Sequence, residues 1–128
     1  MKLPTKKGQA LVELALSLLL LLPLLFGAIE FGRAMYTKNT LNYVAREGAR
    51  LASVSNPFNS ATVQSQLRAS LPASLRSGLV ITITPTAPQQ GNTITVTVQA
   101  PFTTVVPDIL TQLAGITTLS AEASMRYE

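Results

Sequence analysis

The sequence contains neither cysteine nor histidine in its 128 residues. The lack of cysteine excludes a disulfide framework and thiolate chemistry. The lack of histidine removes the commonest metal ligand and the commonest general base. Paired carboxylates at catalytic spacing, a cluster of metal ligands and a glycine-rich phosphate loop are missing from the sequence as well. We therefore predict that the protein is not an enzyme and that it has no catalytic residue, metal or cofactor.

The sequence has little charge outside its first residues. The formal net charge is +4, but three of the ten basic residues, Lys2, Lys6 and Lys7, precede a long apolar run. Without residues 1–8, seven basic side chains face six acidic ones. A nucleic-acid-binding domain keeps its basic residues in the folded part. We therefore predict no nucleic-acid partner and assign the leading charge to the membrane.

The apolar run extends from Ala10 to Ile29 and contains a single charge, Glu13. About twenty residues at ~1.5 Å each span the ~30 Å hydrocarbon core of a bilayer. Lysines ahead of the run predict a cytoplasmic N-terminus and an extracytoplasmic C-terminal region. A cleaved secretory signal is the competing interpretation, but its core is usually shorter, about 7–15 residues. Cleavage after Ala28 would also place the bulky Phe26 two positions before that residue, where a small residue is usual.

The helical pattern continues beyond the membrane run. No proline occurs between Pro23 and Pro57, so we predict one helix from about Gln9 to Ser53. Pro23 leaves the Leu19 carbonyl without its helical partner. It is either a tolerated kink or a weak point where the helix extends during packing.

Small residues recur one turn apart along this helix and allow another helix to come close. The alternative is that the outer stripe packs on the chain's own C-terminal domain. Two oppositely charged pairs, Glu30 with Arg33 and Glu47 with Arg50, are spaced to meet on the helix surface. The small candidate packing residues are Ala28, Gly32, Ala45, Gly48 and Ala49, and the apolar stripe is Leu41, Val44, Ala45, Gly48 and Ala52.

The C-terminal region reads as a short helix followed by strands. Ser60 is the predicted cap of a helix over about 61–70, and a short helical turn is predicted over 107–115. Three segments alternate apolar and polar residues, with a turn at 87–92 between the first two. The strands are expected within 79–86, 92–100 and 119–128, and the third places Leu119, Ala121, Ala123, Met125 and Tyr127 on one face. Their apolar face needs a cover, for which the outer half of the long helix is available.

The stretch "KKGQALVE" has a basic leader, a glycine and a glutamate five residues later inside an apolar helix. This arrangement resembles type IV prepilins. The longer string over residues 7–54 resembles the TadE-like pseudopilins of the tight-adherence (Flp) pilus system. The implied fold is pilin-like and α+β, with a long N-terminal helix, a small antiparallel three-stranded sheet and a short helix. We predict a leader over 1–8, the helix over 9–54 and a small extracytoplasmic α+β domain over 55–128.

The resemblance implies roles for individual residues. Cleavage by a prepilin peptidase would follow Gly8, Gln9 would become the first mature residue, and Glu13 is the pilin-type assembly glutamate. Two departures from major pilins matter: glutamine replaces the usual phenylalanine after the glycine, and the chain is longer than the major Flp pilins. Both favour a minor pilin or pseudopilin over a bulk filament subunit.

The resemblance also implies a location and partners. We expect a single-pass protein that stays in the bacterial cytoplasmic membrane or enters the extracellular pilus. Its expected partners are the bilayer, the prepilin peptidase, the assembly platform, and other pilins or further copies of itself. The alternative is an uncleaved bitopic adaptor of the pilus or secretion platform. An enzymatic or ligand-binding role for the outer sheet is a more distant third hypothesis.

Overall fold

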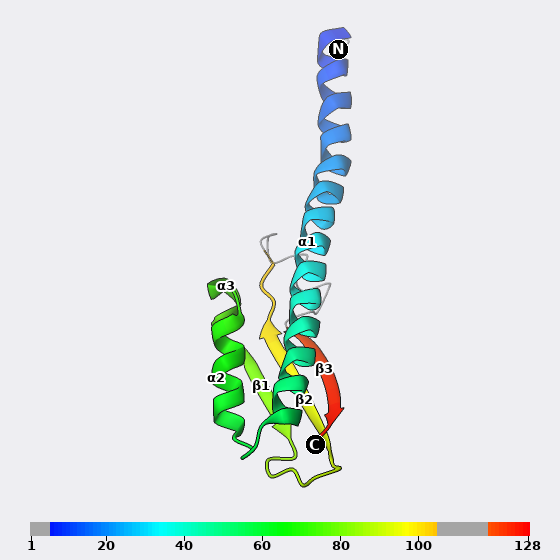
Figure 1. The fold of residues 1–128 in the computed structure, drawn as a ribbon. Coiled ribbons are helices and arrows are strands. Elements are labelled where there is room, and N and C mark those ends of the chain that lie inside the picture. Colours follow the sequence, from blue (N-terminus) through cyan, green and yellow to red (C-terminus); the bar gives the residue numbers. More distant parts are fainter. Residues whose placement is uncertain (1–5, 105–117) are drawn as a thin grey trace. The chain divides into compact units, whose positions relative to one another are not determined.

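A computed structural model of the protein describes residues 6–104 and 118–128 (Figure 1). It contains one long helix, two short helices and an antiparallel three-stranded sheet of order β1-β2-β3. The predicted α+β class is confirmed; the predicted turn over 107–115 lies outside the described residues. The elements are α1 (Lys6–Val54), α2 (Ser60–Ser70), α3 (Ala73–Arg76), β1 (Val80–Thr84), β2 (Thr93–Pro101) and β3 (Thr118–Arg126).

The chain divides into two compact units, Met1–Arg33 and Ala34–Glu128, and α1 contributes to both. In the first unit the described part is helix alone, and Pro23 lies within it. Every leucine between positions 11 and 25 is at least 42% exposed. Such a continuous apolar surface is far larger than monomeric water-soluble proteins leave open. A helix of this length and composition is able to cross a bilayer.

In the second unit the outer part of α1 packs on the sheet because its inward stripe is made of small and apolar residues. Leu41, Ala45, Ala49 and Ala52 have no exposed surface. Gly48 marks the closest approach: a Cβ built there would lie 2.8 Å from Leu67 Cδ1 of α2 and 3.0 Å from Val96 Cγ1 of β2. The alternative interpretation of the stripe, packing on the chain's own domain, is therefore what the structure shows.

The sheet buries one face, as the alternation of its sequence predicts. The register pairs Ile81 with Val98 and Val98 with Ala121, so the inward side chains form continuous rows across the three strands. The opposite face carries mostly threonine and serine. The buried residues of the sheet are Ile81, Ile83, Ile94, Val96, Val98, Ala100 and Ala121.

One local prediction was wrong, and one residue on a correctly predicted face is exposed. Asn59, not Ser60, caps α2: its Oδ1 accepts hydrogen bonds from the backbone N–H groups of Ala61 at 3.0 Å and Thr62 at 3.3 Å, and Ser60 is the first helical residue. Met125, expected to be covered on the apolar face of β3, is 44% exposed. It stands opposite the fully buried Ile94 on the same face, and Tyr127, two residues further on, packs against the core again.

The last two residues close the domain by satisfying carbonyl groups at the end of α1. The Glu128 N–H donates to the Ser53 carbonyl at 3.2 Å, and the Tyr127 hydroxyl donates to the Ser55 carbonyl at 2.8 Å. The Tyr127 ring also contacts Phe58 edge-on, with centroids 6.2 Å apart. The final carbonyls of a helix have no partner within the helix, so the C-terminal strand supplies donors there.

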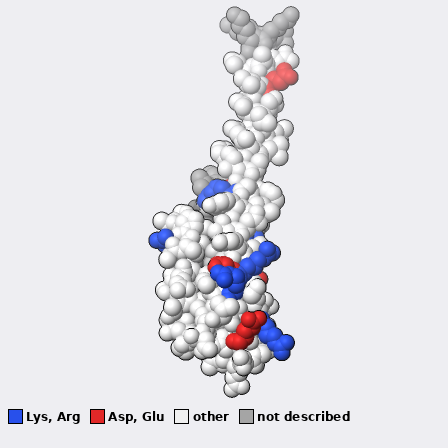
Figure 2. Space-filling model, viewed as in Figure 1, with Lys and Arg blue, Asp and Glu red and all other residues white. Residues whose placement is uncertain are grey.

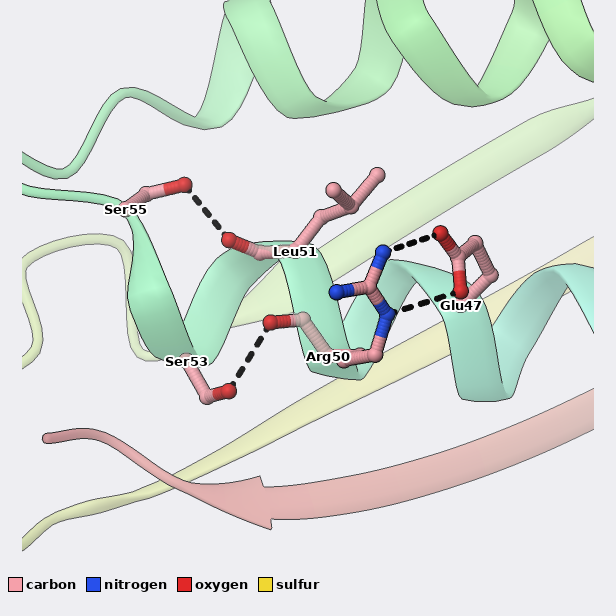
Figure 3. A network of polar contacts seen from close by, with 5 residues as sticks. All are labelled: Glu47, Arg50, Leu51, Ser53 and Ser55. Atoms are coloured by element: carbon pink, nitrogen blue, oxygen red, sulfur yellow. Dashed lines mark hydrogen bonds and ion pairs between the residues drawn. The ribbon is translucent and has the colours of Figure 1, made fainter.

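The predicted ion pair between Glu47 and Arg50 forms on the outer surface of α1 (Figure 3). Arg50 Nη2 donates to Glu47 Oε1 at 2.7 Å and Arg50 Nε to Glu47 Oε2 at 3.0 Å. The hydrogen bond and charge of Arg50 lower the pKa of the Glu47 carboxyl below its ordinary value, and the hydrogen bond that Arg50 donates to Glu47 raises the pKa of Arg50. The second predicted pair forms too, between Arg33 Nη1 and Glu30 Oε1 at 2.9 Å.

The lowered pKa of Glu47 gives a pH dependence of known sign. Its stabilising contribution is complete above the carboxyl pKa of the unfolded chain and disappears as the pH falls through the lower folded pKa. We expect Glu47→Gln to lower the denaturation midpoint of the second unit slightly at neutral pH and not at all in acid, since exposed pairs contribute little. Denaturant titrations of the parent and the variant, from neutral pH into acid, measure the difference in midpoint. A difference that persists unchanged in acid would contradict the stabilising role of the Glu47–Arg50 pair.

Candidate processing and assembly segment

The predicted processing and assembly residues all lie near the start of α1 in the first unit. Gly8 and Gln9 are helical, and Glu13 follows Gln9 by one turn, so the two positions share a face. The face forms a shallow groove lined by Gly8, Gln9, Val12, Glu13, Leu16, Ser17 and Leu20. The structure therefore brings the predicted scissile position and the predicted glutamate onto one side of one helix.

Glu13 stands out electrostatically because it is the only charged residue between Gly8 and Ile29. Figure 2 shows a single acidic side chain on the displayed face of this otherwise uncharged stretch. The Ser17 hydroxyl donates to the Glu13 backbone carbonyl at 2.9 Å, so that serine is satisfied within its own helix and does not bind the carboxylate. Among the side chains that the structure describes, none forms a hydrogen bond or ion pair with the Glu13 carboxylate. An unpaired carboxylate in an apolar helix requires a partner from elsewhere when it leaves water.

The five predicted small packing residues fall into two groups. Ala45, Gly48 and Ala49 are buried in the chain's own core. Ala28 and Gly32 are exposed, and a Cβ built on Gly32 would meet no atom within 4 Å. Packing within the chain thus explains the first group and leaves the second open to another helix.

Two contacts of cationic side chains with the sheet were not predicted. The Lys38 ammonium donates to the Ser120 carbonyl, 82 residues away in sequence, and Arg68 Nη2 donates to the Leu79 carbonyl at 2.9 Å. Sequence patterns do not reveal such pairings because the acceptors are backbone carbonyls and carry no residue-specific signal. In residues 6–104 and 118–128 no group of three or more acidic residues is placed to hold a metal ion.

The fold and the segment together define a class of protein: one with a long apolar helix, consistent with a single-pass membrane anchor, and a small α+β domain. A family model described as TadE-like protein matches residues 8–50, so the chain is TadE-like over the apolar helix and its outward continuation. The resemblance inferred from the sequence is confirmed over that stretch. No curated protein and no solved structure matches the chain.

Proposed function

We propose that the protein is a minor pilin or pseudopilin that is cleaved after Gly8 and acts in assembly of a tight-adherence pilus through its N-terminal helix. The observation that carries the proposal is Glu13, a lone carboxylate inside an exposed apolar helix, five residues beyond Gly8 and one turn beyond Gln9. The TadE-like match over residues 8–50 supports the same role.

Cleavage and the glutamate act together in this proposal. Cutting after Gly8 creates an α-ammonium group on Gln9. An ammonium and a carboxylate that leave water each cost several kcal/mol unless they pair, ~3 kcal/mol or more for either one alone. When helices pack into a bundle, the ammonium of one subunit pairs with Glu13 of its neighbour and sets the axial stagger between them. The helix N-terminus adds partial positive charge that also favours the carboxylate.

The membrane anchor determines on which side of the membrane each part of the chain lies in this proposal, and which partners it meets. Lys2, Lys6 and Lys7 keep the N-terminus cytoplasmic, where a prepilin peptidase reaches Gly8, and the second unit lies outside the membrane. Ala28 and Gly32 offer a close-packing patch to a neighbouring pilin helix or to a second copy. The assembly platform and the bilayer are the remaining partners.

The processing step predicts a definite N-terminus. Protein purified from cells should begin at Gln9, and its intact mass should lack residues 1–8. A free N-terminal glutamine is able to cyclise and lose its charge, whereas N-methylation prevents cyclisation and preserves the pair. Intact-mass analysis and N-terminal sequencing distinguish unmodified, methylated and cyclised Gln9.

A variant pair makes this test specific. Gly8→Leu should retain Met1 because the bulky side chain replaces the glycine at the cut. Gly27→Leu is the matched control, since a Cβ on Gly27 meets nothing within 4 Å, and it should be processed normally. Native protein that retains Met1 in functional pili would refute processing and favour the uncleaved bitopic adaptor.

A further inference from the structure

The strand β3 forms the edge of the sheet on the side away from α2 (Figure 1). One step beyond the end of the β2–β3 register, the Tyr127 N–H donates to the Asn92 carbonyl at 2.8 Å. Bonded and non-bonded pairs alternate along an antiparallel ladder, so the odd-numbered residues of β3 bond to β2. The even-numbered residues therefore direct their N–H and C=O groups outward, and from Ser120 to Arg126 all of them are exposed.

Both ends of this edge are already occupied by contacts within the chain. The Lys38 ammonium donates to the Ser120 carbonyl, and the Glu128 N–H donates to the Ser53 carbonyl at 3.2 Å. Between these ends, no hydrogen bond of the described residues uses the outward backbone groups of 122, 124 and 126. An exposed row of unpaired N–H and C=O groups is a template for a further strand.

The exposed side chains along this open stretch are self-complementary in charge. Glu122 and Arg126 lie on one face of β3, with Ser124 midway between them. Four residues span about 13 Å along a strand, so the two charges are too far apart to pair within one chain. In the part of the chain that the structure describes, the Glu122 carboxylate has no hydrogen bond or ion pair. A second β3 that runs in the opposite direction would set each charge opposite its counterpart.

We propose that β3 pairs antiparallel with β3 of a second copy of this chain, with the two Ser124 residues opposite each other on a two-fold axis. Glu122 of each copy then stands opposite Arg126 of the other, and opposite charges in such cross-strand pairs are stabilising. The even-numbered residues form the bonded pairs, so the outward backbone groups of both strands find partners. An axis at Glu122 or at Arg126 would set like charges opposite each other, which is destabilising.

The apolar face of β3 fits the same register. Its odd-numbered residues form the non-bonded pairs, in which the two Cα atoms are about 4.5 Å apart. Met125 of one copy therefore stands opposite Ala123 of the other. In the single chain Met125 is 44% exposed and Ala123 is half-buried, so each has apolar surface for the other to cover. The pairing gives a reason for a large exposed apolar side chain directly beside the fully buried Ile94.

The contact closes on itself as a dimer, because both copies use the same strand in the same way. It involves the second unit alone. The proposal goes beyond the proposed function and depends neither on the orientation of the anchor nor on cleavage after Gly8. One pair of strands buries less surface than a stable interface needs, so we expect a weak dimer whose population rises with protein concentration.

Cysteine cross-linking of the full-length protein in detergent tests the register. The chain has no cysteine, so Ser124→Cys introduces the only thiol, and every cross-link joins two copies. In the proposed dimer the Cα atoms at this position are about 5.5 Å apart. A bismaleimide shorter than two strand spacings, ~9.6 Å, connects them. We expect a cross-linked dimer that increases with concentration.

Thr84→Cys is the matched control for a chance encounter between copies. Thr84 is also exposed, and the register places it in one row with Thr95 and Ser124. In the dimer, the two copies of Thr84 lie five strand spacings apart, about 24 Å, which is beyond the reach of the same linker. This variant should remain monomeric under conditions that cross-link the Ser124→Cys protein.

Charge exchange tests the two ion pairs. In the Ser124→Cys background, Glu122→Arg or Arg126→Glu sets like charges opposite each other, so each protein alone should cross-link several-fold less than its parent. A mixture of the two proteins restores both ion pairs between unlike copies and should recover the dimer. Intact mass should show one copy of each variant in the recovered dimer. Recovery on mixing excludes unfolding as the cause of the loss, because neither chain has changed.

The proposal is overturned if the Ser124→Cys protein gives no dimer at high concentration or if Thr84→Cys cross-links equally. It is also overturned if the mixture cross-links no better than its two components. None of these readouts depends on the N-terminus. A chain that retains Met1 would refute processing after Gly8 and leave the dimer unaffected.

Discussion

Glu13→Val is expected to abolish co-assembly into pili while membrane insertion and cleavage after Gly8 proceed normally. Valine suits an apolar helix in lipid, so the anchor is preserved. The α-ammonium of a neighbouring subunit, however, loses its partner on leaving water. Breaking a buried ion pair on one side costs about 3–5 kcal/mol. At about 1.4 kcal/mol per tenfold, this lowers the assembly equilibrium more than about a hundredfold.

Sheared pili, quantified by immunoblotting against the membrane fraction, measure the effect. Glu30→Gln is the matched control: it removes another glutamate of α1 in the same unit, one that pairs with Arg33 at 2.9 Å. That variant should assemble normally, because Glu30 already has a partner within its own chain and lies outside the segment from Gly8 to Glu13. Normal pili from Glu13→Val would rule out the pairing role. If the variant protein is not cleaved, its loss of assembly would be caused by failed processing and not by a missing ion pair.

Gly48→Leu is expected to destabilise the second unit by about 3 kcal/mol or more, since inserting methylenes into a packed core forces backbone shifts. The first added carbon already meets Leu67 Cδ1 at 2.8 Å and Val96 Cγ1 at 3.0 Å. Leu67 is 1% exposed and Val96 is fully buried, so neither side chain has free space to occupy. Chemical denaturation of the full chain in detergent, followed by circular dichroism of the sheet, measures the loss.

Gly32→Leu is the control for the change of residue type, because nothing lies within 4 Å of a Cβ there. Its denaturation should match the parent protein. Combining Gly48→Ala with Leu67→Ala should cost less than the sum of the two changes, since the space vacated by Leu67 accepts the new methyl group. Equal destabilisation at positions 32 and 48 would contradict the packing assigned to Gly48.

The elements of this fold are predictable from sequence because their signals are local. The apolar run and the absence of proline from 24 to 56 predict α1, and alternation predicts three strands. The register between the strands comes from the structure. The failures were also local in origin. Asn59 and Ser60 are adjacent residues of good capping type, and only the backbone conformation at Asn59 decides between them. Met125 shares the apolar face of β3, as the alternation predicts, but alternation does not determine how much of each side chain is covered.

The sequence by itself determined the anchor, the lone carboxylate five residues after Gly8, and the strand-rich character of the outer domain, because each depends on residue type and spacing along one segment. Only the tertiary structure decided which small residues serve the chain's own core: Ala45, Gly48 and Ala49 do, while Ala28 and Gly32 stay open. It also placed Lys38 and Arg68 on opposite edges of the sheet. Both outcomes depend on contacts between residues far apart in the chain, which no single segment encodes.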